Sequence, residues 1–323
     1  MSLSSRRYLV TGGAGFIGSH LVDRLLERGD AVVCIDDFND FYAPSEKRAN
    51  VAGQLRRPGY RLVEADIRTR EQMIALAVAL QPTAIIHLAA RAGVRPSVRA
   101  PELYAQTNIL GTLNLLEAAR AASVPRVVFG SSSSVYGLNS TAPFREDHPL
   151  LCPASPYAAT KIAGEALCHS HAHLHELQIV SLRFFTVYGP RQRPDLAIRK
   201  FTERILRGES IELYGDGDSS RDYTHVSDIV AGILAALDYD GSGHALFNLG
   251  NTAPLRLLDM VRAIEAAVGR AARIVWRPEQ PGDVPMTCAD ITRARTLLDF
   301  TPQVGFDDGL RDFVRWLRGA AAA

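Results

Sequence analysis

Hydrophobic and polar positions in the first half of the chain follow two alternating patterns. Short uninterrupted runs rich in Val, Ile and Leu indicate buried strands at residues 7–13, 31–37, 60–67, 84–90, 126–133 and 178–185. Amphipathic stretches with a helical period lie between them, at residues 18–29, 71–80, 107–122 and 157–176. Continuous apolar strands that alternate with helices predict βαβ units. We therefore expect an α/β fold, a Rossmann-type doubly wound parallel sheet covered on both faces.

The pattern loosens after about residue 189. Loops rich in Gly, Pro, Asp and Arg there separate shorter elements, at residues 197–208, 211–217, 225–237, 245–250, 255–269 and 309–319. This change predicts a smaller mixed α/β C-terminal domain. Its loops should face the carboxyl ends of the strands, where open α/β sheets bind ligands.

Charge and cysteine usage narrow the function classes. The 36 Lys+Arg residues nearly balance the 35 Asp+Glu residues, so no global field favours nucleic acid or a membrane surface. No apolar run reaches the length of a membrane span. The four cysteines are scattered without a CxxC pair, and the first strand begins within ten residues of Met1. We expect reduced thiols, no signal peptide and a cytoplasmic protein.

A glycine-rich turn follows the first strand and opens the first helix. Gly13, Gly15 and Gly18 fit GxGxxG, and Gly12, Gly15 and Gly18 fit GxxGxxG. Such a turn lets the backbone and the helix N-terminus approach a pyrophosphate. The second strand ends at Asp36, where a carboxylate accepts hydrogen bonds from an adenosine ribose and repels a 2′-phosphate. This context predicts NAD rather than NADP.

Other strand ends should meet the same cofactor. Asp66 lies where an acid can meet the adenine amino group, and Asn108 either ties the sheet to the cofactor loop or caps its helix. The remaining expected cofactor residues are Phe16, Ile17, Asp37, Asn39, Ile67, Leu88, Ala89, Ala90, Ser131 and Phe184.

Tyr157 and Lys161 lie four residues apart in one predicted helix, hence on one face. A tyrosine with a pKa near 10 is a poor base at neutral pH. A lysine cation and a positive nicotinamide ring would favour the phenolate and bring it into range for general base catalysis. The run from Ser131 to Ser134 ends the fifth strand. A serine hydroxyl there can form a hydrogen bond with the substrate oxygen that Tyr157 deprotonates. Alternatively, the run is only a turn and a helix cap.

These motifs together resemble the extended short-chain dehydrogenase/reductase family. The resemblance rests on TGGAGFIG at residues 11–18, the serine run before residues 135–137, YxxxK, and SSRDYTHVSDI at residues 219–229. Within the family the sequence is most similar to nucleotide-sugar 4-epimerases of the UDP-glucuronate type. The resemblance implies a Rossmann domain that binds NAD at residues 1–185, to which residues 222–250 return. It also implies a nucleotide-sugar-binding domain at residues 186–221 and 251–323.

The implied reaction is NAD-dependent 4-epimerisation of UDP-glucuronate to UDP-galacturonate through a 4-keto intermediate. Tyr157 would be the base, Lys161 would bind the nicotinamide ribose, Ser132 or Ser133 would assist, and NAD would be the transient hydride acceptor. Family members often form homodimers through two helices per subunit, here near residues 102–122 and 157–176.

Several alternatives remain open. The related 4,6-dehydratases carry an Asp-Glu pair in the serine-run segment, and the UDP-glucuronate decarboxylases carry a glutamate at the place of Ser134; both departures favour epimerisation. A UDP-glucose or UDP-N-acetylglucosamine 4-epimerase would differ only in the sugar pocket. A non-catalytic NAD-binding sensor would not need Tyr157, Lys161 and the serines together.

The resemblance also implies a set of substrate residues. Arg221 would meet the UDP diphosphate, Tyr214 would pack against uracil, and Gln280 and Asp283 would lie near the uridine ribose, although Tyr214 and Asp283 also fit an ordinary loop aromatic and a loop acid. The other expected substrate residues near the sugar are Gly93, Arg95, Ser133 and Ser134.

Two arginines in a Gly-Pro turn, Arg191 and Arg193, are the best indication of the sugar. An arginine fork binds a carboxylate through two hydrogen bonds, which a hydroxymethyl group could not match. By resemblance, Arg193 and Thr186 hold the C6 carboxylate and Arg191 lies nearer the diphosphate. Both arginines could instead be solvated. Fixing the carboxylate would also protect a β-keto acid intermediate from losing CO₂.

Four alternating histidines, at positions 169, 171, 173 and 175, lie late on the helix that carries Tyr157. His171 and His175 are one turn apart and could chelate a metal. Because no carboxylate or cysteine completes a set at metal-site spacing, we expect a polar helix face and no metal.

Overall fold

The computed structural model describes residues 6–138, 141–279 and 284–322. Gln280 and Asp283, both predicted to bind the uridine ribose, lie outside these ranges. Among the described helices, none combines the length and the apolar composition that a membrane crossing requires.

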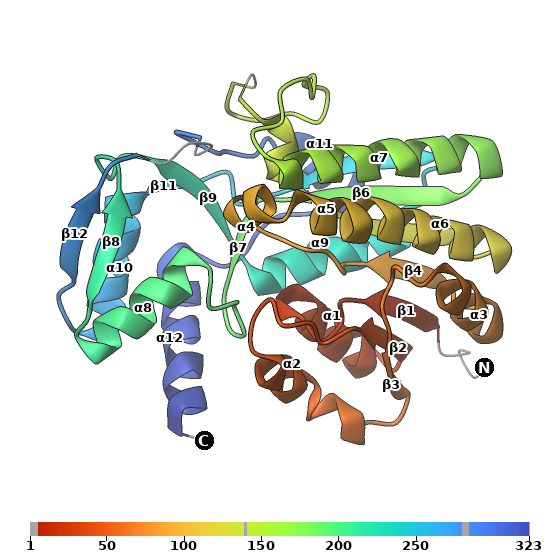
Figure 1. The fold of residues 1–323 in the computed structure, drawn as a ribbon, viewed down its shortest axis with the longest axis horizontal. Helices are drawn as coiled ribbons and strands as arrows, with labels where there is room; N and C mark the ends of the chain where they lie inside the picture. Colours follow the sequence, from red (N-terminus) through yellow and green to blue (C-terminus); the bar gives the residue numbers. More distant parts are fainter. Residues whose placement is uncertain (1–5, 139–140, 280–283, 323) are drawn as a thin grey trace.

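A seven-stranded parallel sheet forms the larger part of the molecule (Figure 1). Its spatial order is β10-β6-β5-β4-β1-β2-β3, and the order reverses next to β1. The strands are β1 (Arg7–Thr11), β2 (Ala31–Asp36), β3 (Tyr60–Glu64), β4 (Ala84–His87), β5 (Arg126–Ser132), β6 (Gln178–Phe184) and β10 (His244–Leu249). This arrangement confirms the predicted doubly wound sheet, and β10 adds the late strand expected near residue 245.

Helices cover both faces of the sheet, and each face has its own hydrophobic core. One core joins the sheet to α1 (Phe16–Glu27), α9 (Val226–Asp238) and α11 (Thr292–Leu298). The other joins it to α3 (Arg70–Leu80), α6 (Gly111–Ala121) and α7 (Pro156–His175). Strands buried on both faces explain why the sequence shows continuous apolar runs rather than alternation.

A smaller lobe lies at the carboxyl end of the sheet, on the left in Figure 1, with a third hydrophobic core. In it β12 pairs in parallel with β8, and β9 pairs with β7 and β11 in a three-stranded sheet. These elements are β7 (Thr186–Tyr188), β8 (Ser210–Tyr214), β9 (Ser220–His225), β11 (Pro254–Arg256), β12 (Arg273–Arg277), α8 (Ala197–Arg207), α10 (Leu257–Val268) and α12 (Phe306–Ala322).

Short helices complete the connections around the sheet edge. They are α2 (Pro44–Val51), α4 (Val94–Arg99) and α5 (Pro101–Tyr104), the 3-10 turns Gln54–Arg56 and Ser133–Tyr136, and a π-helix at Ala105–Leu110. The hydrophobic pattern predicted neither α2 nor α4, because both are short and carry many polar residues.

Candidate active site

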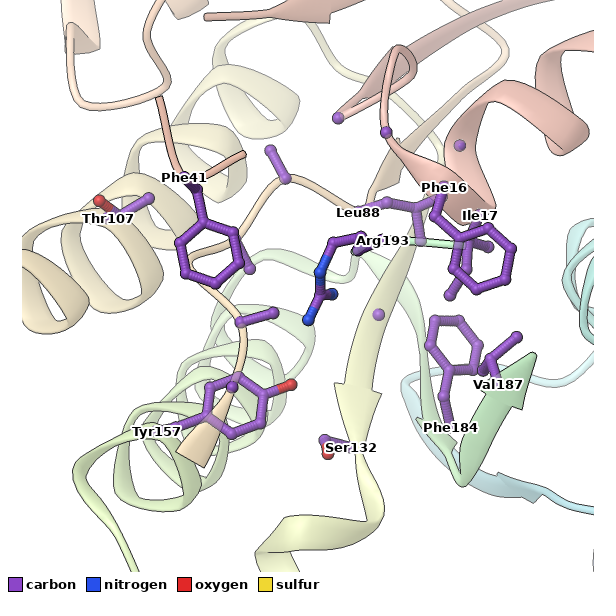
Figure 2. A pocket seen from close by; sticks show the side chains of 18 of the residues that line it. Phe16, Ile17, Phe41, Leu88, Thr107, Ser132, Tyr157, Phe184, Val187 and Arg193 are labelled. Atoms are coloured by element: carbon purple, nitrogen blue, oxygen red, sulfur yellow. The ribbon is translucent and has the colours of Figure 1, made fainter. Parts of the chain in front are cut away.

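A cavity of about 460 Å³ opens at the carboxyl ends of β1, β2, β4, β5 and β6, beside the switch point of the sheet. Figure 2 shows it from close by, with Tyr157 and Arg193 pointing toward its centre. It brings together 22 predicted residues: Gly12, Gly15, Phe16, Ile17, Gly18, Asp36, Asp37, Asn39, Ile67, Leu88, Ala89, Ala90, Gly93, Ser131, Ser132, Ser133, Ser134, Tyr157, Lys161, Phe184, Thr186 and Arg193.

The glycine-rich turn forms one wall of this cavity through its bare backbone. Gly12 has a φ of 69°, and a Cβ there would lie 2.7 Å from the amide nitrogen of Ala89. A Cβ on Gly18 would collide with the carbonyl oxygen of Gly12, so the first turn of α1 packs directly on the loop. The glycines therefore leave the backbone before the N-terminus of α1 open to the cavity, which fits a pyrophosphate.

Asp36 is buried at the end of β2, and backbone amides fix its carboxylate. Oδ2 accepts a hydrogen bond from Ala14 N at 3.2 Å, and Oδ1 accepts one from Phe38 N at 3.0 Å. Burial raises the pKa of Asp36, while the nearby cation of Lys47 lowers it. A fixed acid beside the glycine turn matches the chemistry of a ribose site.

Tyr157 lies in the first turn of α7, close to Ser132 and Arg193. Removal of its hydroxyl from water raises the pKa of Tyr157, and both a hydrogen bond with Ser132 and the charge of Arg193 lower it. Arg193 therefore favours the phenolate as well as facing the cavity. The sequence analysis assigned that electrostatic role to Lys161 and the nicotinamide ring, and not to Arg193.

Lys161 is buried one turn after Tyr157, and its Nζ donates a hydrogen bond to Gly130 O at 2.6 Å. The ammonium also lies over the ring of Phe129, 5.0 Å from the centroid. Burial lowers the pKa of Lys161 to about 8, although the carboxylate of Glu165 opposes the shift. The lysine is thus held beside the end of β5, at the cavity.

The serines of the run differ in what they contact. Ser131 Oγ donates to Glu165 Oε1 at 2.6 Å, so a buried carboxylate holds it. Ser132 is the N-cap of the following 3-10 turn, where its Oγ accepts a hydrogen bond from Ser134 N and donates one to Ser134 Oγ. The cap and the catalytic interpretations of the run are therefore compatible, because Ser132 also interacts with Tyr157.

Arg193 enters the cavity from the loop between β7 and α8. Its guanidinium forms two hydrogen bonds of 2.9 Å with Asp195 and lies 5.5 Å from the ring centroid of Phe41. Thr186, the first residue of β7, lines the same cavity. The two residues predicted to recognise a sugar carboxylate thus share one site with Tyr157.

Arg191 points elsewhere, which corrects the prediction that it faces the diphosphate site. Its Nη1 donates to Asp23 Oδ2 on α1 at 2.7 Å, and it does not line the cavity. Arg191 has a left-handed φ of 62°, so its side chain leaves the loop in a different direction from that of Arg193. His20 also bonds Pro190 O, which pins this loop to α1.

Five more predicted residues do not line the described cavity. The carboxylate of Asp66 is paired with Arg68, two residues later, instead of facing an adenine. Arg221 donates to Ser220 O. Arg95 and Tyr214 contact each other across the two lobes, with the guanidinium 4.9 Å from the ring centroid.

Asn108 is the fifth of these residues. Of its two predicted roles, a tie to the loop after β4 and a helix cap, the structure shows the tie. Its Oδ1 accepts from Arg91 N and its Nδ2 donates to Arg91 O and to Thr160 Oγ1. It therefore ties the loop after β4 to α7 from within the π-helix.

The cavity residues that the sequence analysis did not predict include Phe41, Tyr42 and Lys47, which lie close together in the chain. Lys47 is buried, donates to Asn39 O at 2.9 Å and lies 5.0 Å from the ring centroid of Tyr42. The available signal was a lysine and two aromatic residues within the segment that follows the acidic end of β2.

The histidine tract requires a second correction. No carboxylate nearby in sequence completes a metal-binding set, but Glu117 of α6 lies beside His171 and His175 in space. The predicted polar face therefore includes three potential metal ligands.

Comparison with known proteins agrees with this geometry. The GDP-mannose 4,6 dehydratase family profile matches residues 9–313. UDP-glucuronate 4-epimerase 4 of Arabidopsis thaliana is 44% identical over 95% of this chain and 74% of its own length. The chain belongs to the extended short-chain dehydrogenase/reductase family. The resemblance inferred from the sequence motifs is thereby confirmed.

Two solved structures of this family are similar along nearly the whole chain. UDP-glucuronic acid 4-epimerase from Bacillus cereus, in complex with UDP-glucuronic acid and NAD, has a TM-score of 0.92 at 35% identity and covers 97% of this chain and 99% of its own. UDP-glucose 4-epimerase with UDP-glucose from Thermotoga maritima has a TM-score of 0.89 at 34% identity, covering 98% and 99%. Overall structural similarity therefore does not distinguish between UDP-glucuronic acid and UDP-glucose as the substrate. The residues of the site must make this distinction.

Proposed function

We propose that this protein is an NAD-dependent isomerase that interconverts UDP-glucuronate and UDP-galacturonate by epimerisation at C4. The observation that carries the choice of sugar is Arg193, a fixed cation in the cavity beside Tyr157. The curated UDP-glucuronate 4-epimerases and the Bacillus cereus complex support the same conclusion.

The cavity fits NAD on its own geometry. The bare glycine wall, the N-terminus of α1 and the fixed carboxylate of Asp36 match the pyrophosphate and the adenosine ribose. Lys161 is the cation placed to bind the nicotinamide ribose. When bound, NAD⁺ supplies the acceptor for the C4 hydrogen of the sugar and later returns that hydrogen.

Tyr157 handles the proton of the C4 hydroxyl. Its phenolate oxygen accepts this proton as the C4–O bond becomes a carbonyl, and the O–H electron pair becomes the second C–O bond. For this step the hydroxyl of Ser132 turns away from Ser134 Oγ and donates its hydrogen bond to the C4 oxygen, which limits the charge on that oxygen. After the 4-keto sugar turns its other face, Tyr157 returns the proton and the substrate leaves with inverted C4 and no net redox change.

Arg193 and Thr186 select and protect the uronate. A guanidinium and a hydroxyl bind the C6 carboxylate in a way that a neutral hydroxymethyl group cannot reproduce. The 4-keto intermediate is a β-keto acid, which loses CO₂ when the breaking bond aligns with the carbonyl π system. Holding the carboxylate out of this alignment favours epimerisation over decarboxylation.

The serine run argues against the other family chemistries. Elimination of water needs an acid and a base next to Tyr157, and decarboxylation is associated with a glutamate where this chain has Ser134. In this segment the cavity is lined by the run from Ser131 to Ser134, which supplies hydroxyl groups and no carboxyl group. A UDP-glucose or UDP-N-acetylglucosamine 4-epimerase is the second candidate, which the likeness to the Thermotoga maritima enzyme keeps open.

In this proposal one lobe binds NAD and the other binds the UDP part of the substrate. Residues 1–185 with 222–250 bind NAD, and residues 186–221 with 251–323 bind the UDP moiety through Arg221, Tyr214, Gln280 and Asp283. Asp66 and Arg191 are not included, because each forms an ion pair outside the cavity, with Arg68 and with Asp23 respectively. The contact between Arg95 and Tyr214 supports a uracil site where the lobes meet.

We also infer a cytoplasmic homodimer. Cys34, Cys168 and Cys288 are free thiols, as expected in a reducing compartment. The helices α6 and α7 lie side by side, and Leu174 of α7 is 66% exposed, which suits burial against a second copy. Light scattering after size exclusion should give twice 35.2 kDa, and a single-chain mass would contradict the dimer.

A substrate panel tests the proposed function. The holoenzyme is incubated separately with UDP-glucuronate, UDP-glucose and UDP-N-acetylglucosamine, and the products are identified by NMR. We expect turnover of UDP-glucuronate to dominate. Predominant turnover of UDP-glucose would reject the uronate assignment, and no turnover of any sugar would favour a non-catalytic sensor.

A further inference from the structure

The four alternating histidines of α7 divide between two flanks of the helix. His169 lies against His244, with ring centroids 5.8 Å apart. His171 and His175 are also neighbours, with centroids 5.4 Å apart, and they face α6. The proposed reaction uses neither pair.

Glu117 of α6 lies beside the second pair. One ligand atom each from Glu117, His171 and His175 lies within 4.8 Å of the other two. We propose that these three residues bind a divalent transition metal of the zinc class and thereby link α6 to α7. Two imidazoles and a carboxylate suit Zn²⁺, with water as a fourth ligand.

The ring of His171 is oriented as a metal ligand should be. Its Nδ1 lies 3.0 Å from Leu167 O, an acceptor, so Nδ1 carries a proton and donates it. The neutral ring then presents the lone pair of Nε2 to Glu117 Oε1 at 3.2 Å. A metal ion placed between Nε2 and Oε1 would accept a lone pair from each of these two atoms.

Glu117 is also prepared by its neighbours. Its Oε2 accepts hydrogen bonds from Arg70 and Arg120 at 2.9 and 3.0 Å, while Oε1 remains directed at His171. Ligating carboxylates and imidazoles in metal sites are commonly held by such outer hydrogen bonds, which fix their orientation. The two arginines and Leu167 O thus form the outer shell of the proposed site.

Binding requires only a small contraction. Donor atoms around tetrahedral zinc are roughly 3.3 Å apart, given bond lengths of about 2.0–2.2 Å. His171 and Glu117 already have this spacing. His175 is exposed and is the last residue of α7, so its side chain can close the remaining distance.

The site is remote from the reaction. Tyr157 is in the first turn of α7 and His175 ends it, which places them about 27 Å apart along the helix axis at 1.5 Å per residue. The metal would therefore stabilise the helix pair rather than take part in epimerisation, and its loss should leave turnover unchanged.

Competition for Zn²⁺ against a chromogenic chelator tests the site, with tag-free holoenzyme. We expect one tight Zn²⁺ per chain, and a loss of affinity of roughly 10-fold or more in His175→Gln and in Glu117→Gln. His173→Gln is the matched control, because it is an exposed histidine on the same helix outside the trio; it should bind Zn²⁺ like the wild type.

Two further readouts decide between a metal and a proton. Co²⁺ should give visible absorption bands of a low-coordinate N/O site that His175→Gln lacks, and Zn²⁺ should raise the Tm of the wild type but not of that variant. Absence of stoichiometric binding, equal affinity in His175→Gln, or an equal loss in His173→Gln would overturn the proposal. A proton alone would then hold His171 against Glu117.

Discussion

Asp195 forms hydrogen bonds with only one edge of the Arg193 guanidinium. Nε donates to Oδ1 and Nη2 donates to Oδ2, both at 2.9 Å, and Nη1 takes no part in this pairing. The guanidinium plane is thereby fixed, and the side chain of Arg193 points toward the middle of the cavity (Figure 2). Asp195 is, in this account, the residue that positions the carboxylate-binding cation.

Replacing Asp195 should therefore lower the catalytic efficiency with UDP-glucuronate. In Asp195→Asn the charge-assisted pair is lost and Arg193 gains rotational freedom. We expect kcat/KM for UDP-glucuronate to fall by about 5- to 30-fold, which corresponds to about 1–2 kcal/mol. Steady-state kinetics measures this change.

Asp147→Asn is the matched control for that experiment. Arg145 and Asp147 form the same two-bond pair at the same spacing, but on an exposed loop. This variant should keep wild-type kcat/KM. Equal kinetic losses in the two variants, or none in Asp195→Asn, would mean that Asp195 does not position Arg193.

The fate of the intermediate provides a second prediction. In Arg193→His and in Thr186→Val the C6 carboxylate is held less firmly, so more of the 4-keto uronate should lose CO₂. The share of UDP-pentose among the products should rise several-fold over wild type, as measured by NMR after complete conversion. An unchanged product ratio would count against a protective role for this grip.

The pH dependence of turnover should reflect the neighbours of Tyr157. The charge of Arg193 and the hydrogen bond with Ser132 both lower the pKa of Tyr157, against the effect of burial. Because the phenolate is the active base, Arg193→Met and Ser132→Ala should each raise that pKa. The rising limb of kcat/KM against pH should therefore move to higher pH; a shift to lower pH would contradict the assignment.

Lys161 gives a pH-dependent stability with a defined sign. Its pKa is lowered to about 8 in the folded protein from the usual 10.5. Between these values the unfolded chain binds a proton that the folded chain does not, so the free energy of unfolding rises with pH across that window. The buried thiols of Cys34 and Cys168 have raised pKa values and act in the opposite direction above about pH 9. In urea unfolding of cofactor-free protein, the rise due to Lys161 should therefore appear between pH 8 and pH 10 as a difference between wild type and a variant without this lysine.

The Lys161→Met variant isolates this contribution. The variant should lack the rise, whereas Lys200→Met, on α8 outside the cavity, should keep it. The same pH dependence in wild type and in Lys161→Met would show that other groups cause it.

Glu165 should be essential to stability because it is the buried partner of Arg183. Their side chains are 6% and 2% exposed, and the Nη2–Oε2 distance is 2.8 Å. Glu165→Ala leaves a buried cation unpaired and should lower the free energy of unfolding by about 3–5 kcal/mol. Glu27→Ala, which breaks the exposed pair with Arg24, should cost about 0–1 kcal/mol in the same urea titration. Equal losses in the two variants would contradict the special weight given to the buried pair.

The parts of the fold and site that the sequence predicted are those determined locally. Buried strands and amphipathic helices have their own periods, and the spacing of Tyr157 and Lys161 places them on one helix face whatever surrounds them. The strand-end positions Asp36 and Ala89 also followed from local order, because parallel strands end at one edge of the sheet.

The parts that could not be predicted depend on contacts between distant segments. Arg191 and Arg193 are two residues apart, yet Asp23 of α1 holds one and the cavity receives the other. Glu117 meets the histidines only because α6 packs on α7. Asp66 differs from these examples, because its partner Arg68 is only two residues away in the chain. The ion pair between them depends on side-chain conformations, which the sequence pattern does not determine.

Deuterium at C4 tests the central claim most directly. UDP-glucuronate labelled at this carbon is incubated in ordinary water with the holoenzyme, and the products are analysed by NMR and mass spectrometry. The account predicts UDP-galacturonate that retains the deuterium at C4, since the hydrogen that leaves this carbon returns to it. Loss of the label to water, or the absence of UDP-galacturonate, would contradict it.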